Sequence, residues 1–147
     1  MRVEHALPPL KPMAELDAAA DYQASYLALE LQVEHHNPFP GERTPAERVT
    51  HNGLRPEYVG ENAEMQPALR PAGAESRRYT YGAFAALLVD GWMGSPPHRA
   101  VLLDPTVTNL GCAARLSHGA RGEELVFATQ LFACFRQALG RGGPQGG

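Results

Sequence analysis

The chain has 147 residues, few cysteines, and no long apolar or basic run. Its two cysteines lack CxxC spacing and a second pair nearby, which argues against a zinc ribbon and a redox dithiol. Lys and Arg total 13 against 16 acidic residues and form no basic cluster, so nucleic acid is not the expected partner. No segment reaches the roughly 18 uncharged apolar residues of a membrane span. The composition indicates one globular domain.

Several catalytic motifs are also missing. The chain contains no GxSxG, no HExxH, no Gly-rich phosphate loop and no GxGxxG after a strand. The N-terminal MRVEHALPPLKP lacks the apolar segment of a signal peptide, which fits a cytosolic protein or the mature form of an exported one. Cys112 and Cys134 lie in the apolar stretches LGCAARL and LFACF. We expect buried free thiols there, with a disulfide as the alternative.

The first half of the chain predicts two helices. One begins near Pro12 and ends near residues 35–37, because Pro38 disfavours helix in the residue before it. Its apolar positions recur at spacings of four and three: Leu16, Ala20, Ala24, Leu27 and Leu31. The sequence TPAE at 44–47 has the form of a capping box and predicts a short helix over 45–52.

The middle of the chain predicts two more helices after a strand and a loop. Residues 56–65 indicate a loop that passes into a short strand, and the Pro-, Ala- and Gly-rich residues 66–76 indicate a loop. A helix begins at Thr80 or Tyr81. Ser95 is then the expected N-cap of a short helix that ends before Asp104.

The last third has the alternating pattern of strands. Residues 110–116 alternate, residues 125–135 are apolar on both faces, and the polar SHGARGEE between them predicts an antiparallel hairpin. A strand that is apolar on both faces is usually covered on both sides. We therefore predict an α+β fold, a three-layer α-β-α sandwich with a small central antiparallel sheet, in one domain over 1–138. The Gly-rich tail 139–147 is expected to be disordered.

Polar residues at the ends of these elements are the candidates for chemistry. Two imidazoles and a carboxylate suit zinc, with water completing the shell, or an acid/base pair. The alternatives are exposed caps at the helix C-terminus for the adjacent histidines, a solvated loop carboxylate, and a helix-start histidine bonded to a carbonyl. The candidates are His35, His36, Glu61, Asn62, Ser95, His98 and Arg99.

Five segments, in order from about residue 6 to 135, resemble the CAP superfamily. This family includes cysteine-rich secretory proteins, insect venom antigens and plant pathogenesis-related proteins, and the likeness is to its compact bacterial branch. The segments are LPPLKPMAELDAAADYQASYLA, HNPFPGERTPAER (similar to "H…G.TP..R"), YVGENAEM (similar to the GEN motif), GWMGSPPHRAVLLDPTVTNLGCAA (similar to "WM.SPGHR.NILNP…..G") and ATQLF.

The resemblance implies an α-β-α sandwich with a cleft that holds two histidines and two glutamates. His36 matches the first histidine, with His35 as its substitute, while Glu61 matches the glutamate of GEN and His98 the second histidine. The fourth member falls near Ser95, so one carboxylate is missing. We thus expect a ligand cleft of His36, Glu61, Asn62, Ser95 and His98. No cofactor is required, and zinc or another divalent ion on His36, Glu61 and His98 is the metal hypothesis.

Three functions compete at this stage. The first is a secreted or periplasmic, non-enzymatic binding module for a lipid, a sterol or another small apolar ligand, as the resemblance implies. The second is a metal-assisted hydrolase or peptidase that uses His36, Glu61 and His98. In the third, the polar cluster only ties loops together.

Overall fold

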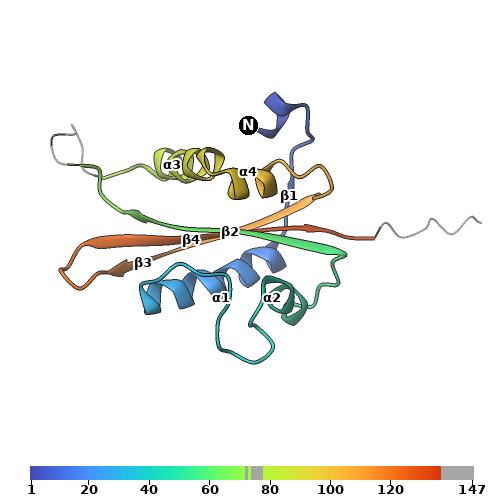
Figure 1. The fold of residues 1–147 in the computed structure, drawn as a ribbon, viewed down its shortest axis with the longest axis horizontal. Coiled ribbons are helices and arrows are strands. Elements are labelled where there is room, and N and C mark those ends of the chain that lie inside the picture. Colours follow the sequence, from blue (N-terminus) through green and yellow to red (C-terminus); the bar gives the residue numbers. More distant parts are fainter. Residues whose placement is uncertain (72, 74–77, 137–147) are drawn as a thin grey trace, which may run out of the picture.

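The computed structural model describes residues 1–71, 73 and 78–136, which form three layers (Figure 1). Helices α1 (Ala14–Glu30) and α2 (Pro45–His51) cover one face of a central sheet. Helices α3 (Tyr81–Gly94) and α4 (Pro96–Leu102) cover the other, and a short 3-10 helix, η1 (Arg2–His5), precedes them. The predicted α-β-α sandwich is confirmed.

The sheet has the strand order β1-β3-β4-β2. Strands β3 (Asn109–His118) and β4 (Glu124–Cys134) form the predicted antiparallel hairpin, and β2 (Tyr58–Pro67) pairs antiparallel with β4. The two-residue β1 (Lys11–Pro12) runs parallel to β3, so the sheet is not wholly antiparallel. Strand β2 is longer than predicted because all ten of its residues pair with β4, a contact that its own polar sequence does not reveal.

Helix α1 ends earlier than the sequence predicts. Leu31 adopts a left-handed conformation (φ 54°), and its N–H bonds to the carbonyl of Leu27. The side chain of Gln23 then donates to the carbonyl of Glu34 at 2.7 Å, which holds the following loop against the helix. The prediction that His35 and its neighbour lie at a helix C-terminus is therefore wrong, and both belong to the loop that follows.

The other helices begin where their capping residues predict. Thr44 accepts from the backbone N–H of Glu47 at 3.1 Å, while the Glu47 carboxylate accepts from the N–H of Arg43 at 2.9 Å. Thr80 caps α3 through its side chain. Ser95 occupies the predicted N-cap of α4, but its side chain makes no capping hydrogen bond.

Two apolar clusters pack on opposite faces of the sheet. On the α1 side, Leu16 and Leu131 are fully buried. On the α3 side, Trp92 and Phe132 are buried together. Gly111 allows α1 to approach β3 closely, because a Cβ at this position would overlap the backbone of Leu16.

The two cysteines are free thiols. Cys112 is exposed and Cys134 is half-buried, so the expectation of two buried thiols is wrong for Cys112. They do not face each other: in the sheet Cys112 lies opposite Gln130 and Cys134 lies opposite Tyr58. The predicted disordered tail (139–147) lies outside the described residues, as does part of the predicted loop 66–76.

Candidate functional site

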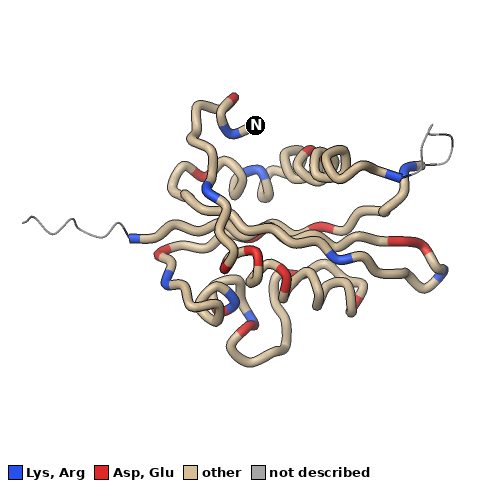
Figure 2. Tube along the Cα trace, turned by 180° about the vertical axis from the view of Figure 1, so that it is seen from behind, with Lys and Arg blue, Asp and Glu red and all other residues tan. Residues whose placement is uncertain are grey.

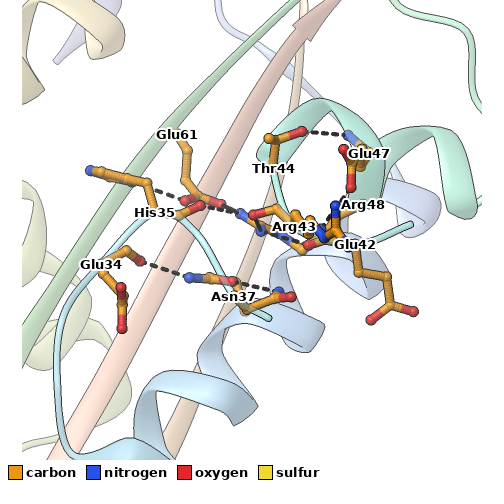
Figure 3. Close-up of polar contacts among 10 residues, drawn as sticks. Glu34, His35, Asn37, Glu42, Arg43, Thr44, Glu47, Arg48 and Glu61 are labelled. Atoms are coloured by element: carbon orange, nitrogen blue, oxygen red, sulfur yellow. Dashed lines mark hydrogen bonds and ion pairs between the residues drawn. The ribbon is translucent and has the colours of Figure 1, made fainter. Parts of the chain in front are cut away.

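The loop after α1 is fixed by buried amides. Asn37 donates from its side chain to Oε1 of Gln23 at 3.1 Å, and Gln23 itself donates to the carbonyl of Glu34. Both amide side chains are buried, at 6% and 0% exposure. This pairing holds the segment from Glu34 to Asn37 over the face of β2 and places His35 beside that strand (Figure 3).

Glu61 lies at the centre of the polar cluster and uses both carboxylate oxygens. Its Oε1 lies 2.9 Å from Nδ1 of His35, and its Oε2 accepts from Nη2 of Arg48 at 2.5 Å (Figure 3). The side chains of Glu61 and Arg48 are 1% and 0% exposed, whereas that of His35 is 46% exposed. The carboxylate therefore orients the imidazole from within the protein and leaves its outer edge accessible.

Arg48 is a site residue that the sequence analysis did not single out. Its guanidinium also donates to the carbonyls of Glu42 at 3.1 Å, and of Arg43 and His35 at 3.4 Å each. It thereby joins α2, the preceding loop and β2. The signal was the arginine of the TP..R stretch, since its place in the last turn of α2 points it toward the sheet.

His98 approaches from the other layer. The side chain of Asn62 donates to the backbone carbonyl of His98 at 3.1 Å, which ties the first turn of α4 to β2. Asn62 is fully buried and His98 is half-buried. Gly60, on the same face of β2, leaves room for α4, because a Cβ there would lie 2.7 Å from Val101.

The pKa values of the two imidazoles, His35 and His98, are shifted in opposite directions. The hydrogen bond to Glu61 is the main cause that raises the pKa of His35 above its usual value. Burial lowers the pKa of His98, and the positive charge of His35 adds to that effect. Compared with a free imidazole, the charged form is thus favoured at His35 and the neutral form at His98.

The predicted metal ligands are not brought together. The ring that meets Glu61 belongs to His35, the substitute for His36, and His36 lies exposed one residue further on. Both oxygens of Glu61 are already engaged, one of them by a guanidinium cation that opposes a metal ion. Within residues 1–71, 73 and 78–136, no three His, Cys, Asp or Glu side chains are grouped as a metal site requires. The donor set does not fit zinc.

An apolar groove runs between α3 and the sheet, and we call it the α3 groove. Its outer part, about 390 Å³, and its inner part, about 270 Å³, share Ala85, Leu88 and Ala114. Figure 2 shows that charged residues gather mainly on the α1 side, whereas α3 carries a single charged residue, Asp90. The outer part is also lined by Ala68, Tyr79, Thr80, Tyr81, Phe84, Leu116 and Val126, and the inner part by Val89, Trp92, Cys112, Ala113, Ala128, Thr129 and Gln130.

A second groove of about 650 Å³ lies on the outer side of α1. Its aromatic wall contains Tyr26 and Phe39, whose rings meet edge to face at 5.9 Å. Tyr22 and Leu29 also line it and are 44% and 74% exposed. The described residues thus offer apolar surface on both outer layers.

Comparison with known proteins supports the same fold. The family model of CAP, the cysteine-rich secretory protein family, matches residues 1–132. No curated protein matches the chain in sequence. No described helix is both long and apolar enough for a membrane span.

The similar solved structures include two surface or extracellular proteins of bacteria. An extracellular protein containing an SCP domain from Bacillus anthracis str. Ames is 23% identical with a TM-score of 0.64, and the match covers 91% of this chain but 36% of that one. An outer surface protein from Borrelia burgdorferi is 17% identical with a TM-score of 0.64, covering 92% of this chain and 84% of that one. At these identities the likeness shows the fold alone.

Proposed function

Because this chain belongs to the CAP family of cysteine-rich secretory proteins, we propose that it is a secreted, non-enzymatic binding module for a small apolar ligand, such as a lipid or a sterol. The observation that carries the proposal is the α3 groove. Its two parts share Ala85, Leu88 and Ala114 and are lined mainly by apolar side chains. Pockets of a few hundred Å³ with apolar walls and few polar groups are typical of small-molecule sites.

The polar cluster has a supporting role in this proposal. Each carboxylate oxygen of Glu61 has a partner, His35 or Arg48, and Asn62 ties β2 to α4 through the carbonyl of His98. These contacts hold the loop after α1 and the first turn of α4 on the two sides of β2. The metal-assisted hydrolase is not carried forward, since its three ligands are not assembled in the described part of the chain.

A fluorescence titration tests the binding function. Trp92 is the only tryptophan of the chain and lines the inner part of the α3 groove, so its emission reports on an occupant there. We expect a saturable change in emission with at least one member of a panel of fatty acids, fatty alcohols and sterols. Absence of saturable binding across the panel would contradict the proposal.

A blocking variant localises the binding. Ala114 is exposed and lines both parts of the groove, so Ala114→Phe fills the groove without removing a core side chain. We expect this variant to lose binding at least tenfold, which corresponds to about 1.4 kcal/mol. Leu29→Phe, in the groove on the outer side of α1, is the matched control and should bind as the wild type does.

The proposed location outside the cytoplasm has its own test. Its support is the family and the printed descriptions of the two similar structures, an extracellular protein and an outer surface protein. Fractionation of the source cells should recover the protein in the medium or outside the cytoplasmic membrane. Recovery only with cytosolic markers would contradict secretion while leaving ligand binding open to its separate test.

A further inference from the structure

Three residues that line the inner part of the α3 groove have a buried polar atom without a hydrogen-bond partner: Gln130, Trp92 and Thr129. The alternation of β4 turns the side chain of Thr129 toward the α1 face, together with that of Leu131. Oε1 of Gln130 and Nε1 of Trp92 remain on the groove side. The two residues are 7% and 3% exposed, so bulk water reaches neither side chain freely. A buried donor or acceptor without a partner destabilises a fold, and a ligand that supplies the missing partner gains free energy.

These two atoms come from opposite walls of the groove. Gln130 lies on β4 between Ala128 and Phe132, which contact the α3 side of the sheet, and the alternation of a strand places Gln130 on that same face. Trp92 belongs to the last turns of α3 and packs over this face. The sheet thus provides an acceptor and the helix provides a donor to the same apolar space.

We infer that the α3 groove binds an apolar molecule that carries a hydroxyl group, with the hydroxyl between Gln130 and Trp92. This inference rests on the proposed function and specifies the chemistry of the ligand. A hydroxyl donates one hydrogen bond and accepts others, so a single group satisfies Oε1 of Gln130 and Nε1 of Trp92 together.

Other common head groups satisfy only one of the two atoms. A carboxylate accepts from Trp92 but sets its charge against Oε1 of Gln130. An ammonium group donates to Gln130 but leaves its donors facing the N–H of Trp92. The hydroxyl is therefore the group that matches both walls.

The rest of the groove suits an extended apolar body. Phe84, Leu88 and Trp92 follow one face of α3, and the eight helical steps from the first to the last span about 12 Å along the helix axis. At the outer end the groove is lined by Val126 and by Leu116, which is 55% exposed. A linear chain thus has a path from the polar inner end to the surface.

A series of head groups on one chain length tests the inference. Dodecanol, dodecanoate and dodecyl methyl ether are titrated into the full chain below their micelle or solubility limits, with Trp92 emission as the readout. We expect dodecanol to bind about tenfold more tightly than either of the others, as a site built around a hydroxyl rejects analogues without it. Equal or tighter binding of dodecanoate or the ether would overturn the hydroxyl assignment and leave the binding function standing.

A variant at the inner end provides the second readout. Gln130→Met keeps the length of the side chain and removes its acceptor, so the preference for dodecanol over the ether should disappear. Gln32→Met, at an exposed position after α1, should keep the preference. If Gln130→Met does not fold, the titrations of the wild type with the three probes test the hydroxyl assignment on their own. If none of the three probes binds the wild type, both this inference and binding in the α3 groove are wrong.

Discussion

Arg48 and Glu61 form an ion pair in the interior, with Nη2 and Oε2 2.5 Å apart and both side chains at most 1% exposed. Desolvation of the two charges is offset here by the carbonyls that surround the guanidinium and by the imidazole on the other carboxylate oxygen. The pair joins α2 to β2 and holds the loop that carries His35. It is therefore the anchor of the polar cluster.

We predict that Arg48→Met lowers the free energy of unfolding by about 3–5 kcal/mol, because it leaves the Glu61 carboxylate buried without its cation. Urea denaturation measures the change. Asp21→Asn, which breaks the exposed ion pair with Arg115, is the control and should cost less than about 1 kcal/mol. A loss of similar size in both variants would mean that the buried ion pair contributes no more to the free energy of unfolding than the exposed one.

The two histidines should titrate on opposite sides of the usual imidazole pKa. The hydrogen bond to Glu61 raises the pKa of His35 and burial lowers that of His98, and the charge of His35 lowers it further. NMR titration of the imidazole protons measures both. In His35→Ala the pKa of His98 should rise, because the neighbouring positive charge is gone. An unchanged His98 titration would show that the two rings do not interact.

The same shift makes stability depend on pH. Since the pKa of His35 is higher in the folded state than its usual value near 6.5, its pairing stabilises the fold below about pH 6.5. This contribution is lost as the pH rises through the folded-state pKa. His35→Ala should therefore destabilise the protein more at pH 5.5 than at pH 9.

Glu64 gives a dependence of the same sign, in a lower pH range. Burial beneath α3 raises the pKa of its carboxyl from 4.5 to about 7, although a hydrogen bond with Gln66 acts the other way. A Cβ at Gly91 of α3 would lie 2.9 Å from Oε2 of this carboxyl, which shows how closely the helix covers it. Because the folded state holds its proton to higher pH than the unfolded chain, stability falls as the pH rises from about 4.5 to 7.

We predict that Glu64→Gln raises the free energy of unfolding by about 1 kcal/mol at pH 8 and has little effect at pH 4.5, the side chain being half-buried and partly screened. Thermal or urea unfolding at the two pH values measures the difference. A variant that is equally stable relative to the wild type at both pH values would contradict the assignment of a raised pKa.

Gly111 is required by the close packing of α1 on β3. A methyl group there would overlap the backbone of Leu16, which cannot move aside as a side-chain tip can. We predict that Gly111→Ala lowers the free energy of unfolding by about 1–3 kcal/mol, as overpacked cores do. Gly82→Ala, where a Cβ meets nothing within 4 Å, is the control. A fully stable Gly111→Ala would show that α1 shifts without cost.

Local signals predicted the elements that they themselves stabilise. The capping box at Thr44 and Glu47 fixes the start of α2. The start of α4 is marked by prolines in its first turn, while the side chain of Ser95 makes no capping hydrogen bond. The end of α1 has no such signal. Leu31 adopts a left-handed conformation, which a leucine in the sequence does not predict. The loop after it is held by the side chain of Gln23, which lies two turns back in the helix.

The sequence predicted most residues of the candidate site, but not the contacts between them, because these join segments far apart in the chain. Spacing favoured His36 over His35, yet it is His35 that meets Glu61. The loop that carries both rings is held by the side chains of Gln23 and Asn37.

Arg48 is the last residue of the quoted HNPFPGERTPAER segment, but the segment by itself predicted no role for its side chain. Its burial follows from the approach of α2 to β2, which no local pattern encodes. Likewise, the α3 groove depends on how α3 sits on β3 and β4.

An NMR experiment on the single tryptophan tests the central claim most directly. With the ¹⁵N-labelled chain, addition of dodecanol should shift the indole N–H resonance of Trp92 and leave the backbone N–H resonances of Tyr22 and Leu29, in the groove on the outer side of α1, unchanged. This result is expected if the hydroxyl accepts from Nε1 in the α3 groove. An unmoved indole resonance at saturating dodecanol, with shifts elsewhere on the protein, would contradict the account.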